Sequence, residues 1–304
     1  MIDVDFENVY GAPAQELVGP YNGAKQFSPL FPGADCLSQV DPGSLNGLVL
    51  LAPPGTVERR YAIAQALRAL RPGAPLTVLA PKDKGGSRLA QDLQMLGCAF
   101  DETARRHHRI CVTTGPGDDQ AVAAALEDGQ AQWLEDLGLW SQPGVFSWNR
   151  IDPGSALLLA HLPGLSGNGA DFGCGVGVLS RAVLTSSGVT HLTMIDVDRR
   201  AIEMAKRNID DARAKLVWAD ARAVTDLSKL DFVVMNPPFH EGGSENHALG
   251  QSFIQRAAIV LRTGGSCWLT ANRHLPYEAI LKPLFRRVNL IAEAGGYKIF
   301  QAQK

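Results

Sequence analysis

A short apolar run that stops at two consecutive prolines restricts this chain more than any other stretch. Residues 232–235 read Phe-Val-Val-Met and are followed by Asn236, Pro237, Pro238 and Phe239. The run is too short for a helix, and a proline lacks the N–H that a strand ladder needs, so we predict a buried strand that ends abruptly. Asn236 then lies at the carboxyl end of a strand, the edge at which open α/β sheets bind their ligands.

The residues after this strand offer hydrogen-bond acceptors for a flat amine. The Asn236 side chain has a carbonyl oxygen, and the stiff backbone at Pro237 has another. Together they can accept hydrogen bonds from the NH2 group of a nucleobase, and the ring of Phe239 can stack on that base. The alternative is a proline-rich turn without a function, and only residues elsewhere in the chain distinguish the two.

The composition is that of a globular protein of a reducing cytosol. At 304 residues, 45% hydrophobic and 20% charged, the chain has room for two domains. No apolar run approaches the ~20 residues that span a bilayer, and the first residues lack the basic start and apolar core of a secretion signal. The five cysteines are scattered and form no C-x-x-C pair, which argues against disulfides and structural zinc. We therefore expect a cytoplasmic protein that neither enters a membrane nor binds a metal.

The first half of the chain has the alternating strands and helices of an α/β sheet, but it lacks the binding motifs that occur in the second half. We predict strands at 48–51, 76–79 and 110–112 and helices at 57–70 and 87–96, the pattern of a parallel sheet with crossover helices. Residues 1–30 are expected to be an extended lead-in, and 114–145 a linker with a short helix. The predicted strand ends carry A-P-P-G and A-P-K-D, with neither D-x-G-x-G nor N-P-P.

Charge leaves the role of this half open. Acidic residues outnumber basic ones over residues 1–145, and the balance reverses in the remainder. Two basic clusters, at 82–88 and 105–109, are either phosphate contacts for a nucleic acid or a solvated face. His107 and His108 are adjacent, and neighbours in a strand point to opposite faces, which disfavours a metal site.

The second half repeats the α/β rhythm to the end of the chain. The predicted helices cover 152–162, a segment from 178, 199–208 and 250–261, and the predicted strands cover 192–195, 216–218, 231–235 and 267–270. Two closing strands, 288–291 and 298–300, flank Gly295-Gly296, so we predict an antiparallel hairpin at the edge of the sheet.

A glycine-rich loop, D-F-G-C-G-V-G over residues 171–177, joins a strand to a helix. A dinucleotide-binding loop needs a third glycine where this chain has Val178. The Asp171 carboxylate would also repel a pyrophosphate, and it would attract a ligand that carries ammonium and sulfonium charges. That description suits S-adenosylmethionine.

Two further acids follow strands, where they can bind other parts of the same ligand. Asp196 lies about 20 residues past the glycine loop, a place from which a carboxylate accepts ribose hydroxyls. Asp220 follows the next strand and could accept an adenine amino group. Asp198 is expected to be a helix cap. Acids at three successive strand ends, with N-P-P-F at the fourth, favour the functional interpretation of Asn236.

The order D-F-G-C-G-V-G, I-D-V-D, W-A-D, N-P-P-F resembles the class I S-adenosylmethionine-dependent methyltransferases that act on amino nitrogens. More narrowly, G-V-F-S at 144–147, N-P-P-F-H-E-G at 236–242, A-N-R-H-L-P-Y at 271–277 and Y-K-I-F at 297–300 resemble the ribosomal small-subunit methyltransferase C family, which methylates guanine N2 in 16S rRNA. The resemblance is specific over residues 144–304.

The resemblance implies an α/β fold of two tandem Rossmann-like methyltransferase domains. Residues 1–140 would be a degenerate copy, used for RNA docking or structural support, and residues 141–304 the catalytic domain. The catalytic sheet would have seven mostly parallel strands and an antiparallel C-terminal hairpin. One departure is G-N-G-A at 167–170, in place of an aliphatic run before Asp171, which predicts a short or irregular first strand.

The resemblance also implies the roles of individual residues. The catalytic residues would be Asn236, Pro237 and Phe239. S-adenosylmethionine would contact Asp171, Gly173, Cys174, Gly175, Asp196, Val197, Asp220, Ala221 and Asn236. The substrate would contact Phe146, Arg150, Phe239, His240 and Arg273. The partner would be ribosomal RNA or the small ribosomal subunit, and we expect a monomer.

Guanine N2 is a poor nucleophile, so the acceptors at Asn236 and Pro237 would hold the amino group in line with the methyl donor. His240 could take up the proton afterwards. Three alternatives stay open. The same acceptors suit N6 of adenine or a protein glutamine, an NAD-dependent oxidoreductase uses a related fold, and a non-catalytic RNA-binding protein would not need Asn236.

Overall fold

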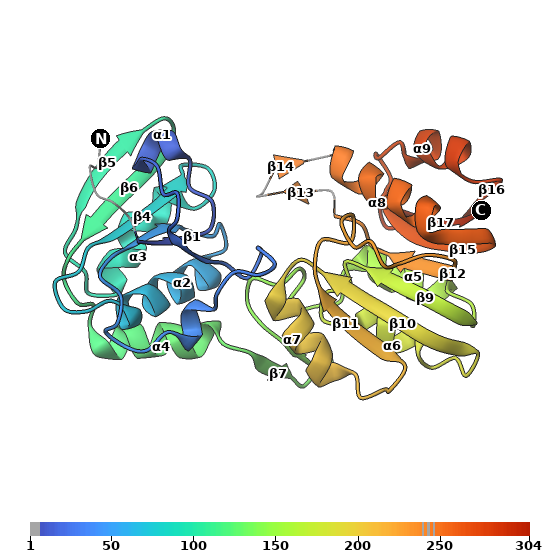
Figure 1. Cartoon of the computed structure of the whole chain (residues 1–304), viewed down its shortest axis with the longest axis horizontal. Helices are drawn as coiled ribbons and strands as arrows, with labels where there is room; N and C mark the ends of the chain where they lie inside the picture. The colour runs from blue at the N-terminus through green and yellow to red at the C-terminus, as the bar shows by residue number, and fades with distance from the viewer. Residues whose placement is uncertain (1–6, 239, 242–243, 246) are drawn as a thin grey trace. The chain divides into compact units, whose positions relative to one another are not determined.

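The computed structural model describes residues 7–238, 240–241, 244–245 and 247–304. The chain divides into two compact units, Met1–Gln130 (unit 1) and Ala131–Lys304 (unit 2) (Figure 1). The boundary that we predicted from the sequence, after residue 140, lies farther along the chain than this one. The difference is a hairpin of β7 (Gln132–Leu134) and β8 (Leu139–Ser141), which belongs to unit 2 because Trp140 is hydrogen-bonded to Asn208 there.

Unit 1 is a six-stranded sheet within its described residues, with strand order β2-β1-β3-β4-β6-β5. Its strands are β1 (Asn8–Tyr10), β2 (Lys25–Phe27), β3 (Leu48–Leu51), β4 (Leu76–Pro81), β5 (Asp101–Arg105) and β6 (His108–Thr113). Its helices are α1 (Gln15–Val18), α2 (Thr56–Ala69), α3 (Leu89–Met95) and α4 (Asp119–Gly129), with short 3₁₀ turns at Leu37–Gln39 and Gly86–Arg88. The strands from β2 to β4 are parallel, and β6 and β5 are antiparallel.

Three predictions for unit 1 were wrong. Residues 8–27 are not a lead-in, because β1 and β2 pair with each other and β1 pairs with β3. The helix in the predicted linker is α4, which packs against α2 inside unit 1. His107 lies in the β5–β6 turn with a positive φ, not in a strand. Strands of three residues contain too little periodicity to be detected from the sequence.

A buried ion pair lies where α2 begins, just after β3. Arg59 is fully buried, and its Nε donates to Oδ2 of the buried Asp92 at 2.6 Å. Arg59 Nη1 donates to the Pro54 carbonyl oxygen at 2.8 Å, and Arg60 Nε donates to the other Asp92 oxygen at 2.7 Å. This guanidinium fills the space at the carboxyl end of β3.

Unit 2 contains the predicted seven-stranded sheet, with strand order β11-β10-β9-β12-β15-β17-β16. These strands are β9 (Gly167–Phe172), β10 (Val189–Asp196), β11 (Ala214–Trp218), β12 (Leu230–Met235), β15 (Leu261–Asn272), β16 (Arg287–Ala294) and β17 (Tyr297–Gln303). The helices are α5 (Pro153–His161), α6 (Val178–Val183), α7 (Arg199–Asn208), α8 (His247–Val260) and α9 (Tyr277–Leu284), and a small hairpin is formed by β13 (His240–Glu241) and β14 (Ser244–Glu245). β15, β17 and β16 are antiparallel and the other pairs are parallel, which confirms the predicted C-terminal hairpin.

The first strand of the seven-stranded sheet, β9, is longer than predicted, and its pairing with β10 shifts register near its start, between Val189 and His191. β9 has six residues and pairs with β10 on one side and β12 on the other. Its glycine is needed for packing, since a Cβ on Gly169 would lie 2.1 Å from the buried ring of Phe232. The ring of Phe232 on β12 therefore fills the apolar space beside Gly169, where β9 has no side chain of its own.

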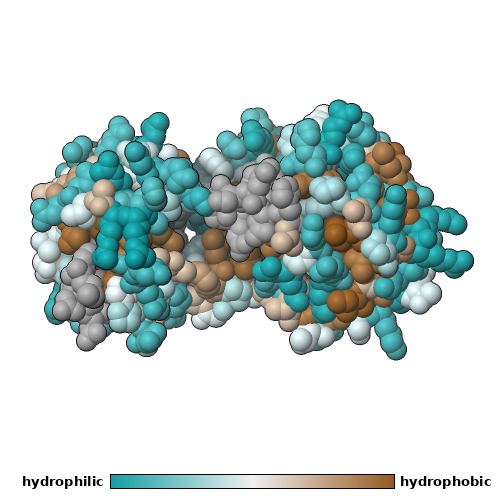
Figure 2. Space-filling view, turned by 90° about the horizontal axis from the view of Figure 1, so that it is seen from above, coloured by the Kyte–Doolittle hydropathy of each residue, from teal (hydrophilic) through white to brown (hydrophobic). Residues whose placement is uncertain are grey.

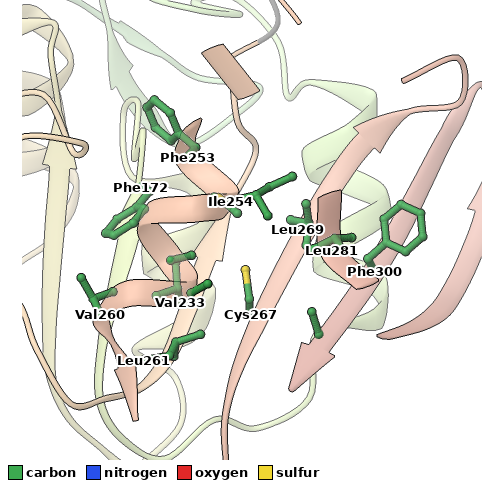
Figure 3. Packing of buried hydrophobic residues seen from close by; sticks show 14 of the residues in the cluster. Phe172, Val233, Phe253, Ile254, Val260, Leu261, Cys267, Leu269, Leu281 and Phe300 are labelled. Carbon is green, nitrogen blue, oxygen red and sulfur yellow. The ribbon is translucent and has the colours of Figure 1, made fainter. Parts of the chain in front are cut away.

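Two hydrophobic clusters cover the two faces of this sheet. Alternate residues of a strand point to opposite faces, so Val233 packs under α8 and α9 while Val234 packs under α5, α6 and α7. Figure 1 shows α8 and α9 on one side of the sheet, and Figure 3 shows Val233, Cys267 and Ile254 of α8 in one buried cluster. In the view of Figure 2, hydrophilic residues predominate on the surface. Within the described ranges, no helix has the length and apolarity to cross a membrane.

The two units share one topology. The order β2-β1-β3-β4-β6-β5 repeats β10-β9-β12-β15-β17-β16, with the same strand directions. Tyr10 pairs with Phe27 and Leu50 as Phe172 pairs with Ile195 and Met235. The repeat supports the predicted tandem architecture.

This shared register also shows what unit 1 lacks. The equivalents of Asp171, Asp196 and Asn236 are Val9, Ser28 and Leu51. None of the three carries a carboxylate or an amide, and the buried Arg59 lies beyond the end of the same strand as Leu51. Unit 1 is therefore a degenerate copy, as predicted.

The buried ion pair gives a test of unit 1. We expect Asp92→Ala to lower the free energy of unfolding by about 3–5 kcal/mol, because it leaves a buried guanidinium without its carboxylate. Urea unfolding followed by circular dichroism measures the change. Fluorescence of the five tryptophans, all in unit 2, follows that unit alone.

The matched control is Asp35→Ala, which removes an exposed ion pair with Lys25 and should barely move the transition. Equal effects of the two substitutions would contradict a structural role for the buried pair.

Candidate active site

A cavity opens at the carboxyl ends of the strands of unit 2. Its walls are the β7–β8 hairpin, residues 146–155, the loop before α6 and the side chain of Asn236. The predicted site residues that line it are Phe146, Arg150, Gly173, Cys174, Gly175 and Asn236. Residues from four separate parts of unit 2 therefore meet at the edge where parallel α/β sheets bind ligands.

The glycine loop places its backbone at the cavity wall. Gly173, Gly175 and Gly177 all have positive φ, a conformation that glycine adopts without strain. The backbone N–H groups of Gly173 and Cys174 donate to the Ile195 carbonyl oxygen at 2.8 and 3.0 Å. Among the residues that the structure describes, no heavy atom outside its immediate chain neighbours lies within 4 Å of the point where Gly175 would carry a Cβ. A ligand can thus approach this backbone closely.

Asp196 ties the end of β10 to that loop. Its Oδ2 accepts a hydrogen bond from the Gly175 N–H at 2.8 Å, and its Oδ1 accepts one from the Asp198 N–H at 2.8 Å. Burial raises the pKa of Asp196 to about 6, and the charge of Asp198 contributes in the same direction. The adjacent Val197 is 40% exposed. Asp198 itself caps α7, as predicted, by accepting from the Arg200 N–H.

Asp171 differs from the expectation that its carboxylate faces the ligand. It is fully buried and does not line the cavity, and Ser180 Oγ donates to its Oδ2 at 2.6 Å. Burial raises the pKa of Asp171 to about 7, and the nearby charge of Asp196 adds to the shift. Asp171 thus anchors the first turn of α6 beneath the glycine loop.

Asp220, the acid that follows β11, is hydrogen-bonded to Arg222. The Arg222 guanidinium donates to both oxygens of Asp220, at 2.9 Å from Nε and 2.6 Å from Nη2. This hydrogen bond holds the pKa of Asp220 below its usual range. Ala221 is buried, and neither residue lines the cavity.

The side-chain amide of Asn236 is held from one side. Its Nδ2 donates to Asp152 Oδ2 at 2.8 Å and to Ser155 Oγ at 2.9 Å. Among the described residues, no group donates to its Oδ1. The following Pro237 is buried and lies outside the cavity lining.

The remaining substrate-site predictions fall in different places. Phe146 is 60% exposed and lines the cavity with Arg150. Arg273 is exposed and forms an ion pair with Glu293 at 2.6 Å, away from the cavity. Phe239 and the side chain of His240 lie outside the described residues.

Cys174 is buried, its Sγ lies 3.6 Å from the Gly175 carbonyl oxygen, and burial raises its pKa well above the usual value. No cluster of three or more His, Cys, Asp or Glu side chains that could hold a metal occurs in the part of the chain described.

Sequence reasoning missed the residues that hold the site together. Asn208 donates to the carbonyl oxygens of Trp140 and Val176, both at 2.9 Å, and accepts from the Trp140 N–H at 2.7 Å. It therefore joins the β7–β8 hairpin to the glycine loop. Asp152 and Ser155 stand in an ordinary helix-start sequence, D-P-G-S, which carries no signal of a contact with Asn236.

Comparison with known proteins identifies the family. The family profile described as the methyltransferase small domain matches residues 136–301, more than half of the chain. Ribosomal RNA small subunit methyltransferase C of Shewanella loihica is 31% identical over 273 residues, covering 86% of this chain and 78% of the relative. The chain belongs to the ribosomal RNA small subunit methyltransferase C family.

The similarity to this methyltransferase C family extends over both units. The protein of the same name from Stutzerimonas stutzeri is 31% identical over 311 residues, covering 96% of this chain and 92% of the relative. The solved structure of the T. thermophilus 16S rRNA N2 G1207 methyltransferase (RsmC) in complex with AdoMet and guanosine matches with a TM-score of 0.73 and 26% identity, covering 88% of this chain and 76% of that one. The family predicted from the motifs is confirmed.

The Asn208 bridge gives a test of the site's architecture. We expect Asn208→Ala to weaken binding of S-adenosylhomocysteine about 10-fold, because three hydrogen bonds that position the hairpin and the glycine loop are lost. Isothermal titration calorimetry measures the affinity. As a control, Asn289→Ala removes a hydrogen bond to Gln301 in the β16–β17 hairpin and should leave the affinity unchanged. Unaltered affinity in Asn208→Ala would show that the hairpin does not shape the cofactor site.

Proposed function

We propose that this chain transfers the methyl group of S-adenosylmethionine to the exocyclic N2 of a guanine in 16S ribosomal RNA. One observation carries the proposal. The Asn236 amide is held through its nitrogen at a cavity formed by the glycine loop, so its carbonyl oxygen is the end left to accept a hydrogen bond. The names of the relatives and the AdoMet and guanosine in the T. thermophilus structure support it.

The residues at the strand ends fit the cofactor. The open backbone of Gly173, Cys174 and Gly175 would lie along the amino-acid part, and Asp196 with Val197 would contact the ribose. Asp220 and Ala221 would contact the adenine, with Arg222 holding the carboxylate in place. Asp171 would act from below, through Ser180 and the loop. When bound, S-adenosylmethionine supplies a methyl group activated by its sulfonium charge.

The chain's own contribution is orientation and charge stabilisation. Asn236 Oδ1 and the Pro237 carbonyl oxygen accept hydrogen bonds from the two N–H groups of the guanine amino group. These bonds hold the amino group in line with the methyl donor. The same oxygens stabilise the positive charge that develops on the nitrogen. The base must leave its stack to reach them, and the exposed Phe146 ring offers a stacking surface at the cavity while Arg150 offers a cation for a phosphate. Stacking on Phe239, proton uptake by His240 and a more distant RNA contact by Arg273 complete the proposed substrate site.

Unit 1 supports binding of the RNA. The backbone N–H of Lys82 donates to the His107 carbonyl oxygen at 2.8 Å, so the loop after β4 lies beside the β5–β6 turn. Arg88, Arg105 and Arg106 are exposed on these segments. Their charges suit phosphate contacts, which position a nucleic acid without reading its sequence. We also propose that the protein acts as a monomer in the cytoplasm and that methyl transfer needs no metal, since oriented acceptors are sufficient.

The product decides between guanine and the other amines. RNA and small subunits from cells that lack this protein are incubated with the enzyme and labelled S-adenosylmethionine, and the nucleosides are separated by mass. We expect N2-methylguanosine. N6-methyladenosine, or label in protein glutamine, would overturn the substrate assignment.

Asn236→Ala tests the role of the amide. We expect turnover to fall by about 10²–10³-fold, because an acceptor that acts on the developing charge is lost. The affinity for S-adenosylhomocysteine should stay within a few-fold of wild type. Asn46→Ala, at an exposed position of unit 1, is the control. Normal turnover in Asn236→Ala would leave RNA binding as the better description of the protein.

Binding of the cofactor should depend on pH through Asp196. Its folded pKa of about 6 is above its ordinary value, so the carboxylate gains a proton as the pH falls through 6 and loses strength as an acceptor of ribose hydroxyls. We expect affinity for S-adenosylhomocysteine to decline between pH 7.5 and 5.5, and this decline to be reduced in Asp196→Asn.

Over the same pH range, the contribution of Asp196 to the stability of the fold should increase as the affinity for S-adenosylhomocysteine declines. A raised folded pKa means that the native state takes up the proton first, so the contribution of Asp196 to the free energy of unfolding grows as the pH falls. Weaker binding at pH 5.5 with an intact thermal transition would separate titration of the site from unfolding. Constant affinity across this range would contradict a role for the ionised carboxylate.

A further inference from the structure

Two residues of the first turn of α5 hold the nitrogen end of the Asn236 side chain. Asp152 is the N-cap of this helix, and its Oδ2 accepts from the Ser155 N–H at 2.9 Å as well as from Asn236 Nδ2 at 2.8 Å. Ser155, only 8% exposed, accepts the second Nδ2 hydrogen at 2.9 Å through Oγ. The two donors of the amide are thus used by one short segment.

This arrangement determines which way the amide faces. An amide has a donor end and an acceptor end of the same shape, whereas an ionised carboxylate only accepts hydrogen bonds. Turning the Asn236 amide over would place its oxygen against the Asp152 carboxylate and cost that hydrogen bond, while the Ser155 hydroxyl, which can donate or accept, fits either orientation. Asp152 therefore directs Oδ1 away from α5, as an acceptor for an incoming N–H group.

The carboxylate also affects the strength of that acceptor. Hydrogen bonds to a charged partner are stronger than neutral ones, and bonds in a chain polarise one another. A negative charge at the Nδ2 end draws the amide dipole into line and places more negative charge on Oδ1. In the proposed function, Oδ1 is the atom that accepts a hydrogen bond from the substrate amine.

The first turn of α5 is itself fixed in place. Gly154 allows the turn to pack on the start of β17, because a Cβ there would lie 2.7 Å from the Tyr297 ring. Asp152 Oδ2 lies 3.0 Å from the same point, so the carboxylate and the Tyr297 ring lie close together. Burial raises the pKa of Tyr297, and the Asp152 charge adds to the rise. The segment that holds Asn236 is therefore supported by the sheet behind it.

We propose that Asp152 and Ser155 are positioning residues that orient and polarise the Asn236 amide for the amine of the substrate. The proposal rests on the function proposed above, because it assigns the fixed amide to the target N–H groups. Both residues act through Asn236.

Three substitutions separate charge, contact and capping. Asp152→Asn keeps an acceptor and a good N-cap but removes the charge, and Asp152→Ser keeps a cap while its shorter side chain no longer reaches Asn236. The double substitution Asp152→Ser with Ser155→Ala removes both contacts and lets the amide turn over. The matched control is Asp118→Ser, at the N-cap of α4 in unit 1, where Asp118 accepts from the Ala121 N–H.

We expect kcat to fall several-fold in Asp152→Asn, about 10- to 100-fold in Asp152→Ser, and close to the level of Asn236→Ala in the double variant. The KM values for RNA and S-adenosylmethionine should stay within about twofold, because the amide orients the reacting amino group and contributes little to binding of the whole RNA or of S-adenosylmethionine. Asp118→Ser should keep the wild-type kcat. A wild-type kcat in Asp152→Ser, or an equal loss in Asp118→Ser, would overturn the proposal.

A second measurement does not depend on the reaction. In protein labelled with ¹⁵N-asparagine, the Asn236 NH2 signal is identified by its absence in Asn236→Ala. We expect both of its protons to exchange at least 10-fold faster with solvent in the double variant than in wild type. If the wild-type protein makes no N2-methylguanosine, the proposed function fails, and these exchange rates still test the contact. Equal exchange in the two proteins would overturn the positioning role even if the enzyme methylates guanine.

Discussion

The pairing of β9 with both of its neighbours is the constraint on which the site of unit 2 depends. β9 lies between β10 and β12, so one central strand sets the distance between the glycine loop, Asp196 and Asn236. The fit is close because Gly169 leaves room for the Phe232 ring. A larger residue at that position would separate β9 from β12, and the separation would reach the loop and the amide together.

The two units show how one topology can keep or lose a ligand site. Both have the same strand order and directions around the central strand, and the same register places Val9, Ser28 and Leu51 where unit 2 has two carboxylates and an amide. In unit 1 the space beyond β3 is filled by Arg59, whose charge is matched by Asp92. In unit 1 a buried arginine side chain therefore lies beyond the end of β3, whereas the residue after β12 in unit 2 borders a cavity.

The acids of unit 2 have separate physical tasks, although each follows or ends a strand. Asp171 is fully buried and holds α6 through Ser180, and Asp220 is paired with Arg222. Asp196 is the one of the three that bonds directly to the backbone of the glycine loop. A carboxylate at a strand end can therefore support a ligand site without touching the ligand.

Local patterns in the chain were enough to predict the α/β class and the closing hairpin, and the resemblance of its motifs to the methyltransferase C family implied the seven-stranded sheet. Apolar runs, glycines with positive φ and prolines act within a few residues, and N-P-P-F with D-F-G-C-G-V-G is specific because few ligands need both. The prediction failed where the signal is short or depends on packing. β1 and β2 have three residues each, the predicted short helix α4 is placed in unit 1 only by its packing on α2, and the Phe232 ring of β12 fills the space beside Gly169 of β9.

Only the tertiary structure decided which way the functional groups face. Asp152 and Asn236 are 84 positions apart, and the sequence around each residue does not predict their contact. Burial of Asp171 beneath the loop and the bridge from Asn208 to the hairpin are also contacts between distant segments. Residue identity determines what a side chain can donate or accept, and the packing of remote elements determines which of those groups is left for a ligand.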